Sequence, residues 1–181
     1  LPKKMFESIT VKTSSGDSDL DIDLEARKMN LKTASGDIIG ADIRCPDLNA
    51  ASTSGDIKLN GLLCQQAELS STSGDIKAGG ELFDVSMATT SGDMEFTGNI
   101  RYLKLQTSSV DVELDGNLGT LTANPVSGDI DGRFSEVPGD MRIESVSGDV
   151  NLSIPENDGF PLSYKRVSGD IRSDFNLLTS I

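Results

Sequence analysis

The tripeptide Ser-Gly-Asp recurs at nearly constant intervals from one end of the chain to the other. Successive aspartates are 20, 19, 19, 18, 18, 18, 20 and 21 residues apart, and one copy carries Val110 in place of glycine. A unit this short cannot bury an apolar face by itself, so neighbouring copies must stack on one another. The nine aspartates that mark the copies are Asp17, Asp37, Asp56, Asp75, Asp93, Asp111, Asp129, Asp149 and Asp170.

Each copy contains two short segments with the alternation of a half-buried strand. Before the aspartate, apolar residues stand at the eighth and sixth positions with a polar residue between them, as in Met29-Asn30-Leu31. After it, the first position is Ile, Val or Met in all copies but one, and the third is apolar or small. The alternation predicts strands with one buried face. The shift in phase across Gly-Asp predicts a tight turn between them.

Glycine suits such a turn because it reaches positive φ at no steric cost. In the central copies a second glycine, five residues after the aspartate, marks another turn, at Gly61, Gly80, Gly98 and Gly116. The glycines expected to form the Ser-Gly-Asp turn are Gly16, Gly36, Gly55, Gly74, Gly92, Gly128, Gly148 and Gly169.

Two all-β architectures fit this pattern. In a parallel β-helix or β-solenoid each copy of 18–21 residues is one coil, and equivalent residues lie about 4.8 Å apart along the axis. In an antiparallel β-meander each Ser-Gly would be a hairpin tip. Recurrence of Ser and Asp at one register favours the solenoid, since stacked side-chain ladders require it. We therefore expect a single solenoid domain over residues 1–181 with about nine coils. Residues 1–4, with a proline and two lysines, would blunt the first strand edge. The apolar segment 175–181 either caps the last coil or docks on something absent from this chain, and the first is favoured.

Charge and composition exclude several classes of function. The net charge is −13, with 16 Lys and Arg against 29 Asp and Glu, which argues against nucleic acid or an anionic membrane as a partner. The chain has no His, so it has no Ser-His or Cys-His dyad and no His metal ligand. No apolar stretch is long enough to span a bilayer, so direct membrane insertion is not expected.

The column of aspartates needs a compensating interaction. Carboxylates 4.8 Å apart repel by about 0.9 kcal/mol per adjacent pair in bulk water. One solution is that each Asp accepts backbone N–H bonds at its own corner, as in Asx-turns. The other is calcium bound between rungs, with Asp37, Asp56, Asp75 and Asp93 as candidates. The glycine-rich nonapeptide of calcium β-rolls is absent, so turn chemistry is favoured and no cofactor is expected.

Further acidic residues lie outside that column, at Asp19, Asp21 and Asp23 and again at Glu113 and Asp115. Paired carboxylates hydrolyse glycosides, and parallel β-helices host such enzymes. Such enzymes also need an aromatic platform and long loops, whereas this chain has six Phe, two Tyr and short connections. A solvated acidic face is the favoured interpretation, and we expect no enzymatic activity.

The two cysteines, Cys45 and Cys64, each stand eight residues after an aspartate. On adjacent coils their Cα atoms would lie near 4.8 Å, within the range that a disulfide allows. An oxidising compartment would join them, whereas a reducing one would keep two stacked thiols. The sequence leaves both states open.

The repeated Ser-Gly-Asp-Ile units, preceded by Leu-x-Thr-type strands, resemble a bacterial family of adhesin-like β-strand repeat domains of unknown function. The resemblance extends from about Ile9 to Ile171, with departures at Val110 and at the out-of-register turn Pro138-Gly139-Asp140. It implies a β-helix-like fold and an extracellular or cell-envelope location, with no catalytic residues to transfer. We expect a non-enzymatic surface scaffold whose partner is a protein or a glycan. The alternatives are a calcium-binding envelope module and a polysaccharide-acting β-helix enzyme.

Overall fold

The chain forms a single continuous stack of strands in the computed structural model, which describes residues 5–20, 25–156, 159–166, 168 and 171–172. No helix long and apolar enough to cross a membrane occurs among these residues. The expectations for residues 1–4 and 175–181, and for Asp21, Asp23, Gly169 and Asp170, concern positions outside the described residues. The strands are β1 (Phe6–Lys12), β2 (Ser18–Leu20), β3 (Ala26–Lys32), β4 (Ile38–Ala41), β5 (Arg44–Ala51), β6 (Ile57–Ser70), β7 (Ile76–Ser91), β8 (Met94–Ser109), β9 (Val112–Ser127), β10 (Ile130–Phe134), β11 (Asp140–Ser145), β12 (Val150–Ser153), β13 (Leu162–Arg166) and β14 (Ile171–Arg172).

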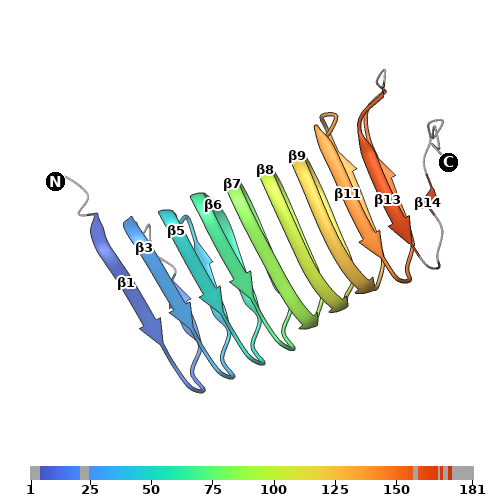
Figure 1. Ribbon diagram of the computed structural model, residues 1–181. Helices are drawn as coiled ribbons and strands as arrows, with labels where there is room; N and C mark the ends of the chain where they lie inside the picture. The colour runs from blue at the N-terminus through green and yellow to red at the C-terminus, as the bar shows by residue number, and fades with distance from the viewer. Residues whose placement is uncertain (1–4, 21–24, 157–158, 167, 169–170, 173–181) are drawn as a thin grey trace.

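Every strand pairing is parallel, and each joins one copy of the repeat to the next. The register follows the repeat: Met29 pairs with Leu48, Leu48 with Ala67 and Ala67 with Val85. Figure 1 shows the strands side by side in chain order. The all-β prediction of a parallel β-solenoid is confirmed, with about eight turns, and the antiparallel alternative is wrong.

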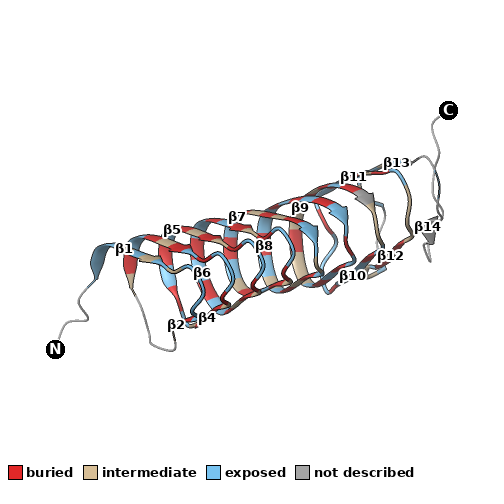
Figure 2. Cartoon of the chain, turned by 90° about the horizontal axis from the view of Figure 1, so that it is seen from below, coloured by how far each residue is buried: buried red, intermediate tan, exposed pale blue. Residues whose placement is uncertain are grey.

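The interior of the solenoid is filled by the positions that the alternation marked as apolar. In the coil before Asp93, for example, Val85 and Met87 are fully buried, and Ile76 is buried after the preceding corner. Buried residues line the inside of the coils from β3 to β12 and exposed ones point outward (Figure 2), while inward residues of the outermost strands, such as Ile9 and Leu162, are partly buried. Because each coil contributes the same few inward positions, the core is one continuous column of side chains.

The long strands β6 to β9 continue around corners that divide each coil into three faces. The first corner is Ser-Gly-Asp, and the second is the later glycine, which has φ near +130° to +140° at Gly80, Gly98 and Gly116. A third corner, which the sequence analysis did not identify, follows Leu82 in β7, where Phe83 and Asp84 both point outward before Val85 turns in again.

The glycine of the first corner is required for two different reasons along the stack. Positive φ, the predicted reason, holds at Gly92, Gly128 and Gly148. It is wrong for Gly16, Gly36, Gly55 and Gly74, which do not have positive φ. A Cβ built at Gly55 would instead collide with the carbonyl oxygen of Gly36 in the preceding coil. Close stacking of main chains therefore excludes side chains at Gly36, Gly55 and Gly74, and it adds to the effect of positive φ at Gly92, Gly128 and Gly148. It does not act at Gly16, where the nearest described atom to a Cβ would be Thr13 Oγ1 at 3.4 Å.

Candidate binding surface

Each central coil turns its third corner with two adjacent outward-facing residues. In β7, β8 and β9 these pairs lie between buried residues that are in register, as with Leu82 and Ile100. Consecutive coils therefore place their corner residues directly beside one another, about 4.8 Å apart. We call this line of side chains the third-corner ridge; it consists of Gln65, Gln66, Phe83, Asp84, Arg101 and Tyr102.

Two exposed aromatic rings and a guanidinium form a cluster at the middle of the ridge. Phe83 is 47% exposed and Tyr102 is 42% exposed, and their ring centroids are 5.5 Å apart in an edge-to-face arrangement. The Arg101 guanidinium carbon lies 4.9 Å from the Phe83 ring centroid and 5.5 Å from that of Tyr102. Edge-to-face packing and cation–π attraction hold the three side chains together while leaving much of the rings in contact with solvent.

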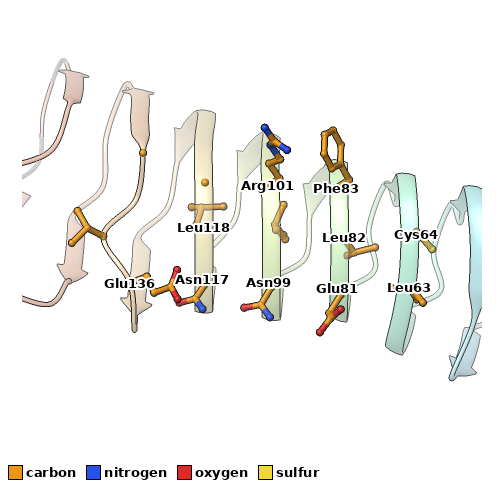
Figure 3. Close-up of a pocket in the computed structure, with 14 residues that line it drawn as sticks. Leu63, Cys64, Glu81, Leu82, Phe83, Asn99, Arg101, Asn117, Leu118 and Glu136 are labelled. Atoms are coloured by element: carbon orange, nitrogen blue, oxygen red, sulfur yellow. The ribbon is translucent and has the colours of Figure 1, made fainter.

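An open groove of about 610 Å³ runs across several coils beside this cluster. Its floor includes Cys64, Leu82, Ile100 and Leu118 from successive coils. A row of polar side chains, Glu81, Asn99 and Asn117, borders it, and Figure 3 shows them side by side with Glu136.

One end of the groove is closed by the segment 135–139, where the out-of-register Pro138-Gly139 turn lies. The Gly139 N–H donates to the carbonyl of Gly119 at 2.7 Å, and the Ser135 hydroxyl lies 2.6 Å from Asn117 Oδ1. These contacts attach the extra turn to the preceding coil, so that Glu136 and Val137 line the groove. The out-of-register turn that departs from the repeat pattern thus forms a wall of the groove.

A second hollow of about 540 Å³ lies on the other side of Phe83. It is lined by Pro46, Asp47, Gln65, Gln66 and Asp84 in addition to the Phe83 ring. The pairing register places Asp47, Gln66, Asp84 and Tyr102 in one line along the axis. The exposed aromatic cluster therefore has hydrogen-bonding side chains on both sides.

The aspartate column lies at the first corner, away from this surface. Six of these carboxylates accept the backbone N–H of the aspartate in the next coil, namely those of Asp17, Asp37, Asp56, Asp75, Asp111 and Asp129. The prediction that each Asp bonds at its own corner was therefore wrong about the donor, which comes from the neighbouring coil. The Lys58 ammonium also bonds Asp56 Oδ2 at 2.8 Å and lowers the pKa of that carboxyl.

The four calcium candidates, Asp37, Asp56, Asp75 and Asp93, are in this column. One oxygen of Asp37, Asp56 and Asp75 is already used by a backbone N–H from the next coil. Within the described ranges, no three His, Cys, Asp or Glu side chains gather closely enough to hold a metal ion. The geometry gives the calcium hypothesis no support.

The acidic residues proposed as glycosidase candidates do not form an isolated pair. Glu113 is 2.7 Å from the Arg133 guanidinium of the next coil, in an exposed ion pair. Asp19 is exposed in β2. This arrangement is that of a solvated face, as the sequence favoured.

The two cysteines pair in register on β5 and β6 and are free thiols. The Cys45 thiol donates to the carbonyl of Asp47 at 2.8 Å. Burial raises the pKa of Cys45, and it raises the pKa of Cys64 to about 12. Both side chains are therefore protonated at neutral pH, and a disulfide between them under oxidising conditions stays a prediction.

The third-corner ridge was not predicted from the sequence. Its residues occupy the same position in successive coils but are of different types, so they form no visible motif. The detectable signal was a pair of consecutive residues in each copy. The pair lies between the inward residue seven or eight positions after one Asp and the inward residue eight positions before the next Asp. Reading those pairs coil by coil would have brought Phe83 and Tyr102, two of only eight aromatic residues, onto adjacent coils.

Comparison with known proteins identifies a family to which the chain is similar, but no individual related protein. The family model described as Toastrack DUF4097 matches residues 1–96 and again residues 81–180. No curated protein and no solved structure matches the chain. The two matches overlap in the central coils and together extend over nearly the whole repeat array.

Proposed function

The chain belongs to the Toastrack DUF4097 family, a repeat domain of unknown function, and we propose that it is a non-enzymatic binding module. The solenoid acts as a rigid scaffold, and the third-corner ridge with its groove is the surface that contacts a ligand. The adhesin-like resemblance adds a location to this proposal, the extracellular space or the cell envelope, where the ligand would be a protein or a glycan.

The observation that carries the proposal is the exposed Phe83–Arg101–Tyr102 cluster. Large apolar side chains that remain exposed together, beside a groove and among polar residues, mark interaction sites on soluble proteins. Four of the exposed large hydrophobic residues, Leu63, Phe83, Tyr102 and Val137, lie in or beside this groove. The core does not need these side chains, because inward positions on the same strands already fill it.

A non-enzymatic role is supported by the chemistry of the same surface. The groove is open, and the ionisable side chains that line it are Cys64, Glu81, Arg101 and Glu136. Arg101 is packed against two rings, and the Cys64 thiol is protonated. A binding role uses the shape and exposed rings of this surface and requires no activated group.

The test is a binding survey with matched variants. Immobilised protein is exposed to an array of glycans and an array of cell-surface proteins, alongside a Phe83→Ser/Tyr102→Ser variant. The control is Ile39→Ser/Val146→Ser, which removes two exposed apolar residues elsewhere on the solenoid. We expect at least one array member to bind the wild type and the control but not the ridge variant. Equal binding by all three, or no binding to either array, contradicts the proposal.

A further inference from the structure

We propose that the ligand of the third-corner ridge is a neutral polysaccharide, a chain of uncharged hexose units that lies along the solenoid axis across β6, β7 and β8. This inference rests on the proposed binding function and names the chemical class of the ligand. It follows from the aromatic rings, the polar side chains beside them, the local charge and the hydrogen bonding of the main chain.

The rings supply the apolar contact that a sugar requires. A hexose ring presents C–H groups on its faces, and these pack against exposed aromatic surfaces in the way that other apolar groups do. Phe83 and Tyr102 stand on adjacent coils, each more than two-fifths exposed. Arg101 restrains both rings from one side, so the platform is held in place before the ligand arrives.

The neighbouring polar side chains supply hydrogen bonds of the type that sugar hydroxyls make. Gln66 and Asp84 are in register with Tyr102, and Glu81 is in register with Asn99 on the groove side. Within the described part of the chain, the side chains of Gln66, Asp84, Glu81 and Asn99 make no hydrogen bond, so they are available to a ligand. Amide and carboxylate groups can each engage two neighbouring hydroxyls of one sugar.

The spacing of these groups suits a polymer. The same side-chain position recurs every 4.8 Å or so along the axis, a step comparable to the length that one hexose adds to an extended polysaccharide. An extended chain could then meet Gln66, Asp84 and Tyr102 with successive units. Since the groove extends from Leu63 to Glu136, the surface is long enough for several sugars.

Local charge favours an uncharged ligand. Glu81 and Glu136 line the groove and Asp84 lies on the ridge, against the single guanidinium of Arg101, which is packed on the rings. The whole chain carries a net charge of −13. Polyanionic polysaccharides would be repelled from this surface, whereas neutral ones would not.

The main chain at the ridge disfavours an extended peptide. Peptides that add as a β-strand need free backbone N–H and C=O groups at a sheet edge. Here β6, β7 and β8 each have a neighbouring strand on both sides and present no open sheet edge, and the pairing includes Gln66, Asp84 and Tyr102 at the corner. A helical peptide would need a continuous exposed apolar stripe, whereas Leu82, Ile100 and Leu118 on the groove floor are only 4–6% exposed. The side chains, and no backbone groups, must therefore recognise the ligand.

The test uses the whole chain and isothermal titration with defined probes. Hexasaccharides of β-1,4-glucose, β-1,3-glucose, β-1,4-N-acetylglucosamine and α-mannose are compared with alginate and heparin fragments of similar length. We expect at least one neutral hexasaccharide to bind and neither polyanion to do so. Phe83→Ala/Tyr102→Ala should weaken that binding about tenfold or more, and Gln66→Ala/Asp84→Ala should weaken it as well.

Ile39→Ser/Val146→Ser is the matched control and should bind as the wild type does. Thermal melting of each variant separates loss of binding from loss of fold. The inference is overturned if no neutral hexasaccharide binds, if the polyanions bind instead, or if the ridge variants bind equally well. Ridge-dependent binding to a protein alone would overturn the glycan inference and keep the proposed function, whereas binding independent of the ridge would reject both.

Discussion

The backbone N–H of Asp56 donates to Oδ1 of Asp37 at 2.9 Å, so the carboxylate of one coil is bonded to the main chain of the next. Equivalent bonds join Asp75 to Asp93 and Asp129 to Asp149, with lengths of 2.9 and 2.7 Å. Charge-assisted hydrogen bonds of this kind along most of the stack explain how a column of like charges is tolerated. Among the described residues, no such bond joins Asp93 to Asp111.

Because of this difference, Asp75 and Asp93 should contribute unequally to the stability of the protein. Asp75→Ala removes the acceptor of the Asp93 N–H and should destabilise the protein by about 1–3 kcal/mol. Asp93→Ala removes a carboxylate whose oxygens accept no N–H from the next coil, so it should cost less. Urea unfolding followed by circular dichroism measures both. Equal losses would show that the inter-coil bond does not stabilise the column.

The Asp56–Lys58 pair predicts a specific dependence on pH. The hydrogen bond from Lys58 lowers the pKa of Asp56, so the folded protein binds that proton more weakly than the unfolded chain does. The resulting stabilisation is present above the unfolded-state pKa of about 3.9 and is lost as the pH falls through the lower folded-state pKa. Lys58→Met should raise the pKa of Asp56, and carboxyl-resolved NMR titration measures it. An unchanged pKa would contradict this assignment.

The close stacking of corners predicts that two equivalent glycines differ in their tolerance of a side chain. A Cβ at Gly55 would collide with the main chain of Gly36, whereas at Gly16 the nearest described atom is Thr13 Oγ1 at 3.4 Å. Gly55→Ala should therefore cost about 1–3 kcal/mol through overpacking, and Gly16→Ala should be nearly neutral. Thermal melting of the two variants gives the comparison, and similar melting temperatures would argue against stacking as the constraint.

The buried hydroxyls before the first corner provide another matched pair. Thr33 Oγ1 accepts the Gly36 N–H at 3.0 Å, and it is buried. Thr107 occupies the equivalent place before Val110, and its buried hydroxyl has no hydrogen-bond partner among the described residues. Thr33→Val should cost about 1–2 kcal/mol, while Thr107→Val should be neutral or stabilising. The free energy of unfolding in urea measures both, and a larger loss at Thr107 would refute the assignment.

The sequence was sufficient to predict the fold because every copy of the repeat shows the same alternation of inward and outward residues. Alternation at positions such as Val85 and Met87 marks the inward face, and one register for every Asp is compatible with parallel stacking. It could not reveal which coil donates to Asp37, since an Asx-turn and an inter-coil bond place the same demand on residue type. Gly55 illustrates the same limit, because steric exclusion and positive φ both select glycine.

The candidate site was harder to predict because it depends on single residues outside the repeated motif. Phe83, Arg101 and Tyr102 stand at the third corner, where other coils have residues such as Gln65 and Thr120. No single residue type occupies these positions throughout, so the repeat pattern does not identify them. Their proximity becomes apparent only when the register between β7 and β8 is known.

Tyrosine fluorescence tests the ridge as a ligand-binding surface most directly. The chain has no Trp and only two tyrosines, so Tyr164→Phe leaves Tyr102 as the sole emitter near 305 nm, a wavelength characteristic of tyrosine. Titrating this variant with the neutral hexasaccharide that binds best should change the emission saturably, with the dissociation constant found by calorimetry. The reciprocal Tyr102→Phe variant, in which Tyr164 emits, should show no change. Binding that leaves Tyr102 emission unaltered, or that alters only Tyr164, would place the ligand elsewhere and contradict the account.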